Sequence, residues 1–369
     1  MNEFLLHRES YNEHYNCSTY NVNTISLTSR QRFWVGITEY LLFLVLETMY
    51  FLCLYAISRP KLIKSESYKI MFTLGVVEMI GMIMLGPVQA TFNILGVVYC
   101  SSPMLNLAAG QVGMLVWYTE TQLSAILVLN RVLYVCSPHY STLFHGKKVY
   151  CWIIAPFFSA ALMSWFTTPV LFTAVEGGFI FDPHNGYLAW DPYFFPYVHF
   201  VYNHIFSLVL AAIYLYLGAL VYGKRHAKSG LNHKTVQDYS LFLQISIICF
   251  LAMCTAMGYA YEGFLKSSYV TIATAYAYIF YQSSPAFVYL LLNKTIKREI
   301  SLLITPLIKK RKKVEPIKLR VQTFDANFFS PFQREGAIRP SLSWSNPQVL
   351  KPAGFYHPNP QHKLFYGHY

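Results

Sequence analysis

The stretch that decides the fold runs from Leu105 to Val135 and reads LNLAAGQVGMLVWYTETQLSAILVLNRVLYV. It is long enough to cross a bilayer, because about 20 apolar residues in a helix span the hydrocarbon core. Two charged residues interrupt it, Glu120 in the middle and Arg131 near the end. A charge in a membrane helix is costly and is usually functional. Arg131, with Pro138 seven residues further on, is therefore the first residue to explain.

The same pattern recurs along the chain. Hydrophobic residues make up 54% of it and charged residues only 12%, with a mean hydropathy of +0.34. This charged share is about half that of a soluble domain. Seven apolar segments predict an all-α integral membrane protein built as a seven-transmembrane helix bundle: 33–57, 68–92, 105–135, 149–174, 197–222, 239–263 and 268–292. The fourth contains Pro156 and Pro169, which a bundle tolerates when neighbours satisfy the freed carbonyls. A soluble helical protein is disfavoured by seven such segments, and β-barrel spans would alternate in polarity.

Basic residues predict the orientation. Lys and Arg are concentrated in residues 58–69, 136–148 and 223–238 and in the C-terminal tail, whereas residues 93–104 and 175–196 contain none. The positive-inside rule therefore places the N-terminus outside and the C-terminus inside. The net charge of +12 lies mostly on one membrane face, where an anionic inner leaflet attracts it. It is not a nucleic-acid-binding signal.

This orientation divides the chain into four parts. Residues 1–32 form an extracellular segment, and residues 33–292 form the bundle. Residues 293–313 combine apolar positions at helical spacing with a basic cluster at 309–313, which predicts an amphipathic helix on the inner leaflet. Residues 314–369 are rich in Pro, Phe, Tyr and His without periodicity, and they are expected to be a disordered cytoplasmic tail.

Two features of the external segments predict modification. Asn16-Cys17-Ser18 is a glycosylation sequon, so we expect Asn16 to carry a glycan. Of seven cysteines, Cys17 and Cys100 are the two that fall outside, where an oxidising environment favours a disulfide. Two free or separately buried thiols are the alternative.

Seven helices in this orientation resemble rhodopsin-like receptors in motifs of the third and the seventh helix. Those receptors end their third helix in Asp-Arg-Tyr with a later proline, and here Asn130-Arg131 and Pro138 match in part. Their seventh helix carries Asn-Pro-x-x-Tyr, and here Pro285 is kept while Tyr289 comes one place late. The resemblance implies that these five residues form a switch for a heterotrimeric G protein. The missing acid removes the local ion pair that holds such receptors inactive. In those receptors a disulfide commonly joins the third helix to the loop between the fourth and fifth helices. The corresponding loop here, 175–196, has no cysteine.

Four strings indicate a narrower family. They are YNCS at 15–18, SYKIMFTLG at 67–75, LNR at 129–131 and VYLLLNKTIK at 288–297. Their order and spacing resemble the nematode serpentine receptor class T family over roughly residues 15–300. That family consists of chemosensory receptors. The resemblance implies a receptor in the plasma membrane of a sensory cell, which binds a small-molecule ligand and signals to a heterotrimeric G protein. With the sequon at Asn16 we expect a glycoprotein, and we expect no enzyme.

Three acids fall in the middle of the first three segments: Glu47, Glu78 and Glu120. Aligned on the receptor pattern, they point to one small polar chamber. Three ionised carboxylates in a low dielectric repel one another, so protons or a cation such as sodium must compensate them. We expect this shared site at Glu78 and Glu120 and no other cofactor or metal. Three separately hydrogen-bonded neutral acids are the alternative.

The outer half of the bundle is expected to hold the ligand. Its aromatic and polar residues suit a small-molecule pocket, although most aromatics of a chain with 17% aromatic residues serve packing. The pocket residues we predict are Trp117, Tyr118, His199, Tyr202, Tyr259 and Tyr276. Amine receptors bind ammonium with an acid on the third helix, and the matching position here is Gly113.

Two other functions compete with a receptor. A ligand-gated channel or transporter would use the buried glutamates, but the two halves of the chain show no repeated broken helices. An intramembrane enzyme would need catalytic groups, and the sequence has no His-Glu-x-x-His motif and no credible pair of aspartates.

Overall fold

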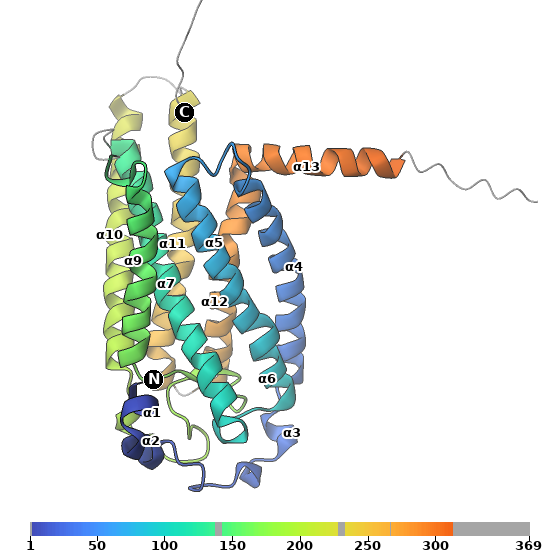
Figure 1. Cartoon of the computed structure of the whole chain (residues 1–369), viewed down its shortest axis with the longest axis vertical. Coiled ribbons are helices and arrows are strands. Elements are labelled where there is room, and N and C mark those ends of the chain that lie inside the picture. The colour runs from blue at the N-terminus through green and yellow to red at the C-terminus, as the bar shows by residue number, and fades with distance from the viewer. Residues whose placement is uncertain (1, 137–141, 228–232, 266, 313–369) are drawn as a thin grey trace, which may run out of the picture. The chain divides into compact units, whose positions relative to one another are not determined.

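The computed structural model describes residues 2–136, 142–227, 233–265 and 267–312. Within these residues seven long helical segments run side by side (Figure 1). They are α4 (Phe33–Ile57), α5 (Glu66–Ile83) with its continuation α6 (Gln89–Leu95), α7 (Pro103–Cys136), α9 (Lys148–Phe166), α10 (Tyr197–Ala227), α11 (His233–Leu265) and α12 (Ser268–Leu292). A π-helical turn, η2 (Met84–Val88), joins α5 to α6 around Pro87. The all-α membrane fold predicted from the sequence is confirmed.

Six of these segments are long and apolar enough to cross a membrane, as far as the described residues show. The seventh, α12, is more polar, but Thr271, Thr274 and Gln282 are buried inside the bundle. Polar groups that face neighbouring helices instead of lipid are compatible with a membrane-spanning helix. The more polar composition of α12 therefore reflects its burial.

The fourth predicted span, 149–174, is wrong at its C-terminal end. Helix α9 stops at Phe166, and the chain continues into a hairpin of β1 (Leu171–Thr173) and β2 (Gly178–Ile180), paired antiparallel. Pro169 explains the early end, because the residue before a proline disfavours helical conformation. Pro156 is tolerated inside the helix.

The outer end of the bundle is covered by the N-terminal segment and the loops. The short helices there are α1 (Asn2–Leu6), α2 (Arg8–His14), η1 (Val22–Thr24), α3 (Leu27–Arg30), η3 (Tyr99–Ser101) and η5 (Pro192–Phe194). A disulfide joins Cys17 to Cys100, with Cα atoms 5.3 Å apart, and this is the pair that the sequence predicts. It fastens the N-terminal segment to the connection between α6 and α7.

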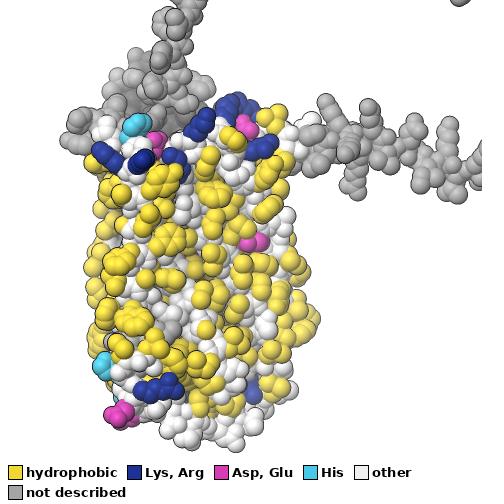
Figure 2. Space-filling model, viewed as in Figure 1, with side chains coloured by type: hydrophobic (Ala, Val, Ile, Leu, Met, Phe, Trp, Pro, Cys, Tyr) yellow, Lys and Arg dark blue, Asp and Glu magenta, His cyan; other side chains and the backbone are white. Residues whose placement is uncertain are grey.

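At the opposite end, α13 (Lys294–Lys312) turns away from the bundle axis (Figure 1). Asn293 caps it, since its Oδ1 accepts hydrogen bonds from the backbone N of Thr295 and Ile296, both at 3.1 Å. Basic side chains gather at this end, while apolar side chains cover the sides (Figure 2). The positive-inside rule assigns such an end to the cytoplasm. The side chains of the basic cluster at 309–313 and the predicted tail, 314–369, lie outside the described residues. On the same face, η4 (Thr142–Phe144) lies between α7 and α9.

Candidate functional site

The loop between α9 and α10 is fastened to α7 by one side chain. Asn106 Oδ1 accepts a hydrogen bond from Phe172 N at 2.6 Å, and Asn106 Nδ2 donates to Phe172 O at 2.8 Å. The loop also approaches α7 at Gly110, where a Cβ atom would lie 1.7 Å from Val170 O. An amide and a glycine thus hold the loop where rhodopsin-like receptors commonly use a disulfide.

Beneath this loop lies the outer cavity, a space of about 50 Å³ within the helices. Trp117, His199 and Tyr259 line it from α7, α10 and α11. Phe179 and Phe181, in or next to β2, also line it. The wall is almost wholly apolar and aromatic, as small-molecule sites usually are.

A buried hydrogen-bonded chain stiffens one side of the outer cavity. Trp117 Nε1 donates to Asn203 Oδ1 at 3.0 Å, which leaves Asn203 Nδ2 to donate to His199 Nε2 at 2.9 Å. His199 must then carry its proton on Nδ1, which lies 3.4 Å from the Tyr118 hydroxyl. The sequence prediction missed Asn203. Its spacing of four residues from His199 was the signal that was available.

Two of the other predicted pocket residues lie behind the wall of the outer cavity. Tyr118 is fully buried and contacts His199 instead of the space itself. The Tyr202 hydroxyl lies 2.6 Å from Thr121 Oγ1, so it links α10 to α7. Both tyrosines therefore support the wall and do not line the cavity.

On α12 the tyrosine that lines the outer cavity is Tyr278, not the predicted Tyr276. The Tyr276 hydroxyl forms a hydrogen bond with Thr38 and so faces α4. The Tyr278 ring packs edge-to-face on Trp117, with ring centroids 5.2 Å apart. Residues two apart on a helix do not share a face, which explains why only one of the two tyrosines reaches the cavity.

Two of the three predicted carboxylates form a buried polar centre below the outer cavity. The Tyr50 hydroxyl donates to Glu78, and Gln282 Nε2 donates to Glu120 Oε2 at 3.0 Å. The second oxygen of each carboxylate has no hydrogen-bond partner among the described residues. Gly81 makes room for this arrangement, because a Cβ atom there would lie 1.8 Å from Gln282 Nε2.

Glu47 does not share these contacts. It is only partly buried, and in the described part of the chain its buried Oε2 has no hydrogen-bond partner. The acid of α4 that is hydrogen-bonded to amide side chains is instead Glu39, which accepts from Gln89 Nε2 at 2.5 Å and from Asn93 Nδ2 at 3.0 Å. The expectation of one chamber for three acids is therefore replaced by a centre around two, with a separate cluster nearer the outer face.

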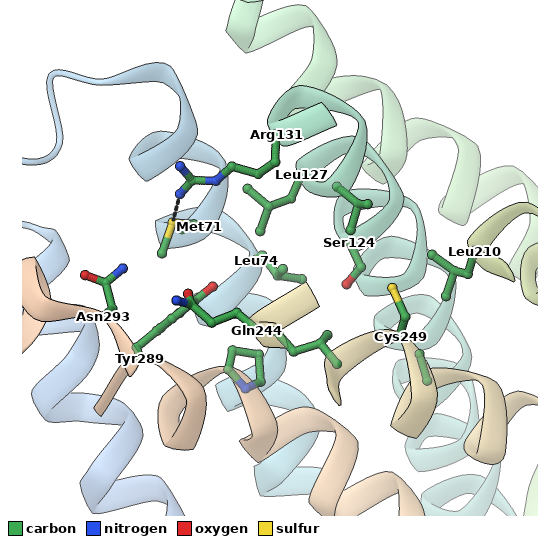
Figure 3. Close-up of a pocket in the computed structure, with 14 residues that line it drawn as sticks. Met71, Leu74, Ser124, Leu127, Arg131, Leu210, Gln244, Cys249, Tyr289 and Asn293 are labelled. Atoms are coloured by element: carbon green, nitrogen blue, oxygen red, sulfur yellow. Dashed lines mark hydrogen bonds between the residues drawn. The ribbon is translucent and has the colours of Figure 1, made fainter. Parts of the chain in front are cut away.

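The inner cavity, also about 50 Å³, lies at the cytoplasmic end of the bundle (Figure 3). Arg131 lines it from α7, and Pro285 and Tyr289 line it from α12. Gln244 and Cys249 of α11 close the facing side. An α-helix with its side chains is about 10–12 Å across. The inner cavity is therefore too small, in this conformation, to admit a helix of a partner protein.

Arg131 is held by a weak partner. Its Nη2 donates to Met71 Sδ at 3.1 Å, and no carboxylate of the described residues pairs with it. A thioether sulfur is a poor acceptor. The neighbouring Asn130 points elsewhere, since its Oδ1 accepts from Ser67 Oγ at 2.6 Å and so links α7 to α5. Pro138 lies outside the described residues.

Seven membrane helices with an aromatic cavity at one end, an arginine-lined cavity at the other and buried carboxylates between them define a seven-transmembrane receptor. Comparison with protein families agrees, because the model of the serpentine type 7TM GPCR chemoreceptor family Srt matches residues 1–313. The chain belongs to this family, which confirms the resemblance seen in the sequence. It is thus a multi-pass membrane protein of a receptor class. A search of curated proteins found no match.

Proposed function

We propose that this protein is a chemosensory receptor of the plasma membrane of a sensory cell, which binds a small molecule in the outer cavity and activates a heterotrimeric G protein through the inner one. One observation carries the proposal: α5, α7, α10, α11 and α12 all line both cavities. A change in the packing of these helices at one end therefore alters the other.

The size of the cavities indicates how the switch works. A space of about 50 Å³ is small against the roughly 300–1,000 Å³ of typical ligand pockets, so a ligand must move the walls of the outer cavity. A ligand shifts a two-state equilibrium only through its different affinity for the two states. A cue that fits the expanded outer cavity will favour the state in which α11 has moved off Arg131 and the inner cavity is open.

The test is Arg131→Ala in a heterologous cell that carries a G-protein biosensor, screened with a panel of small odorants and metabolites. The matched control is Arg59→Ala, an exposed arginine on the same membrane face whose guanidinium lies over the Tyr55 ring. We expect Arg131→Ala to reach the cell surface normally but to lose activation by any agonist of the native receptor. Arg59→Ala should be delivered and activated as the native receptor is. Full activity of Arg131→Ala would refute the mechanism.

We also propose that the buried polar centre couples a cation or a proton to activation. Its support is the pair of carboxylate oxygens, one on Glu78 and one on Glu120, that lack partners among the described residues. Ionised acids so placed need a counter-charge. Glu78→Gln should change the sodium or pH dependence of signalling, and an unchanged response to both would exclude this role.

A further inference from the structure

A larger space than either cavity lies outside the bundle core. This outer vestibule has a volume of about 260 Å³ and opens between the α9–α10 loop and the outer ends of α11 and α12. Glu176, Asp182 and Trp190 line it from the loop, and Glu262 and Thr271 line it from the helices. No Lys, Arg or His is among the lining residues that the structure describes.

Glu262 is the residue that points to a ligand. It is only 4% exposed, yet both of its carboxylate oxygens lack a hydrogen-bond partner among the described residues. Its strongest charged neighbour is another acid, Glu176. An ionised carboxylate that is buried without a partner is strongly unfavourable in a low-dielectric site, unless a proton or a cation compensates it.

Glu176 is in a different position. Burial raises the pKa of its carboxyl, and the nearby Arg32 guanidinium acts in the opposite direction. Arg32, the residue before α4, is itself held against the α9–α10 loop, since its Nη2 donates to Val175 O at 2.6 Å. Arg32 therefore offsets Glu176, and among the residues that the structure describes no basic side chain does the same for Glu262.

The walls of the vestibule are aromatic. Phe181, Trp190, Phe195, Tyr259 and Phe264 all line it. Ring faces attract organic cations, most strongly when water is excluded. The described residues contain no group of three His, Cys, Asp or Glu side chains that could hold a metal ion. An acid among aromatic rings suits an ammonium group with apolar substituents better than a metal.

We propose that the outer vestibule binds a small organic cation, with Glu262 as its counter-charge and the aromatic rings as its walls. The site is separate from the outer cavity, although Phe181 and Tyr259 line both. In the vestibule the counter-charge comes from Glu262 on α11. The position on α7 at which amine receptors carry their acid is Gly113 in this chain.

The test uses the purified full-length receptor in lipid nanodiscs without G protein. The probes are choline and phenyltrimethylammonium, each beside its uncharged carbon isostere, 3,3-dimethylbutan-1-ol and tert-butylbenzene. Binding is measured by calorimetry and by thermal stabilisation. We expect a cation to bind at least tenfold more tightly than its isostere, because only the cation carries the charge that Glu262 complements.

Three variants locate the site. Glu262→Gln keeps the shape and removes the charge, and it should weaken cation binding by about ten- to a hundredfold, the range for a lost charged contact. Glu262→Asp keeps the charge and should retain most of the affinity. Glu9→Gln makes the same change at an exposed external acid and should have no effect. Equal binding of cation and isostere, no binding of either cation, or full affinity in Glu262→Gln would overturn the proposal.

Discussion

The fastening of the loop by Asn106 can be tested by a single substitution. Asn106→Leu keeps the branching of the side chain but replaces the amide oxygen and the amide nitrogen with methyl groups. The backbone N and O of Phe172 then lose the partners that they contact at 2.6 and 2.8 Å. Both residues are fully buried, so water is excluded from these two groups.

The expected cost follows from those two groups. Each buried polar group left without a partner costs about 1–3 kcal/mol, so two cost about 2–6 kcal/mol. Other tethers of the loop remain, among them the hydrogen bonds from Ala174 N to Val97 O at 2.8 Å and from Arg32 Nη2 to Val175 O at 2.6 Å. The hairpin should therefore stay in place but open more often. Since each 1.4 kcal/mol is about a tenfold change, opening becomes at least roughly 30-fold more frequent.

Hydrogen–deuterium exchange of the purified receptor measures this opening directly. Peptides that cover residues 171–180 should exchange at least roughly 30-fold faster in Asn106→Leu, while peptides from α12 should be unchanged. The control is Met104→Ala, because Met104 lies in the same turn of α7 and is 60% exposed. Unchanged exchange of the hairpin in Asn106→Leu would show that the loop is held by something other than this amide.

Three further predictions concern other parts of the molecule. Gly81→Ala should displace the Gln282 amide and lower the unfolding temperature relative to Gly113→Ala, where a Cβ atom meets nothing within 4 Å; equal unfolding temperatures would contradict this. Asn16→Gln should remove a glycan, seen as a lower apparent mass that glycosidase treatment no longer changes, because Asn16 is exposed in its sequon. Cys17→Ser should loosen the N-terminal segment and speed its cleavage by external protease, whereas unaltered cleavage would mean that the disulfide does not restrain it.

The helices were predictable because their signal is local. Each apolar segment is long enough to span a bilayer, and the predicted span 268–292 coincides with α12. The end of α9 was missed because Pro169 was treated like Pro156, although a proline inside a packed helix and a proline beyond its last turn act differently. The hairpin has strands of three residues, too short for any periodicity to show.

The contacts of the site were less predictable, because they join residues far apart in sequence. Glu78 and Glu120 stood out as charges inside apolar segments, and this identified the polar centre. Glu47 stood out equally, yet the rotation of α4 places Glu39 rather than Glu47 among amide donors. Periodicity along one helix does not fix that rotation, since packing against neighbouring helices decides it.

The weak partner of Arg131 has a consequence for the resting state. In the absence of an adjacent acid, its contact with Met71 contributes little. What keeps the inner face closed must then be the packing of α11 against the inner cavity, where Gln244 and Cys249 lie. Packing of this kind depends on side-chain volume. A small-to-large change at Cys249, such as Cys249→Phe, should therefore force the cavity open and raise basal G-protein activation, whereas Met71→Leu, which removes the sulfur but keeps the volume, should leave it nearly unchanged. The opposite ranking would show that the sulfur contact, and not the packing, restrains Arg131.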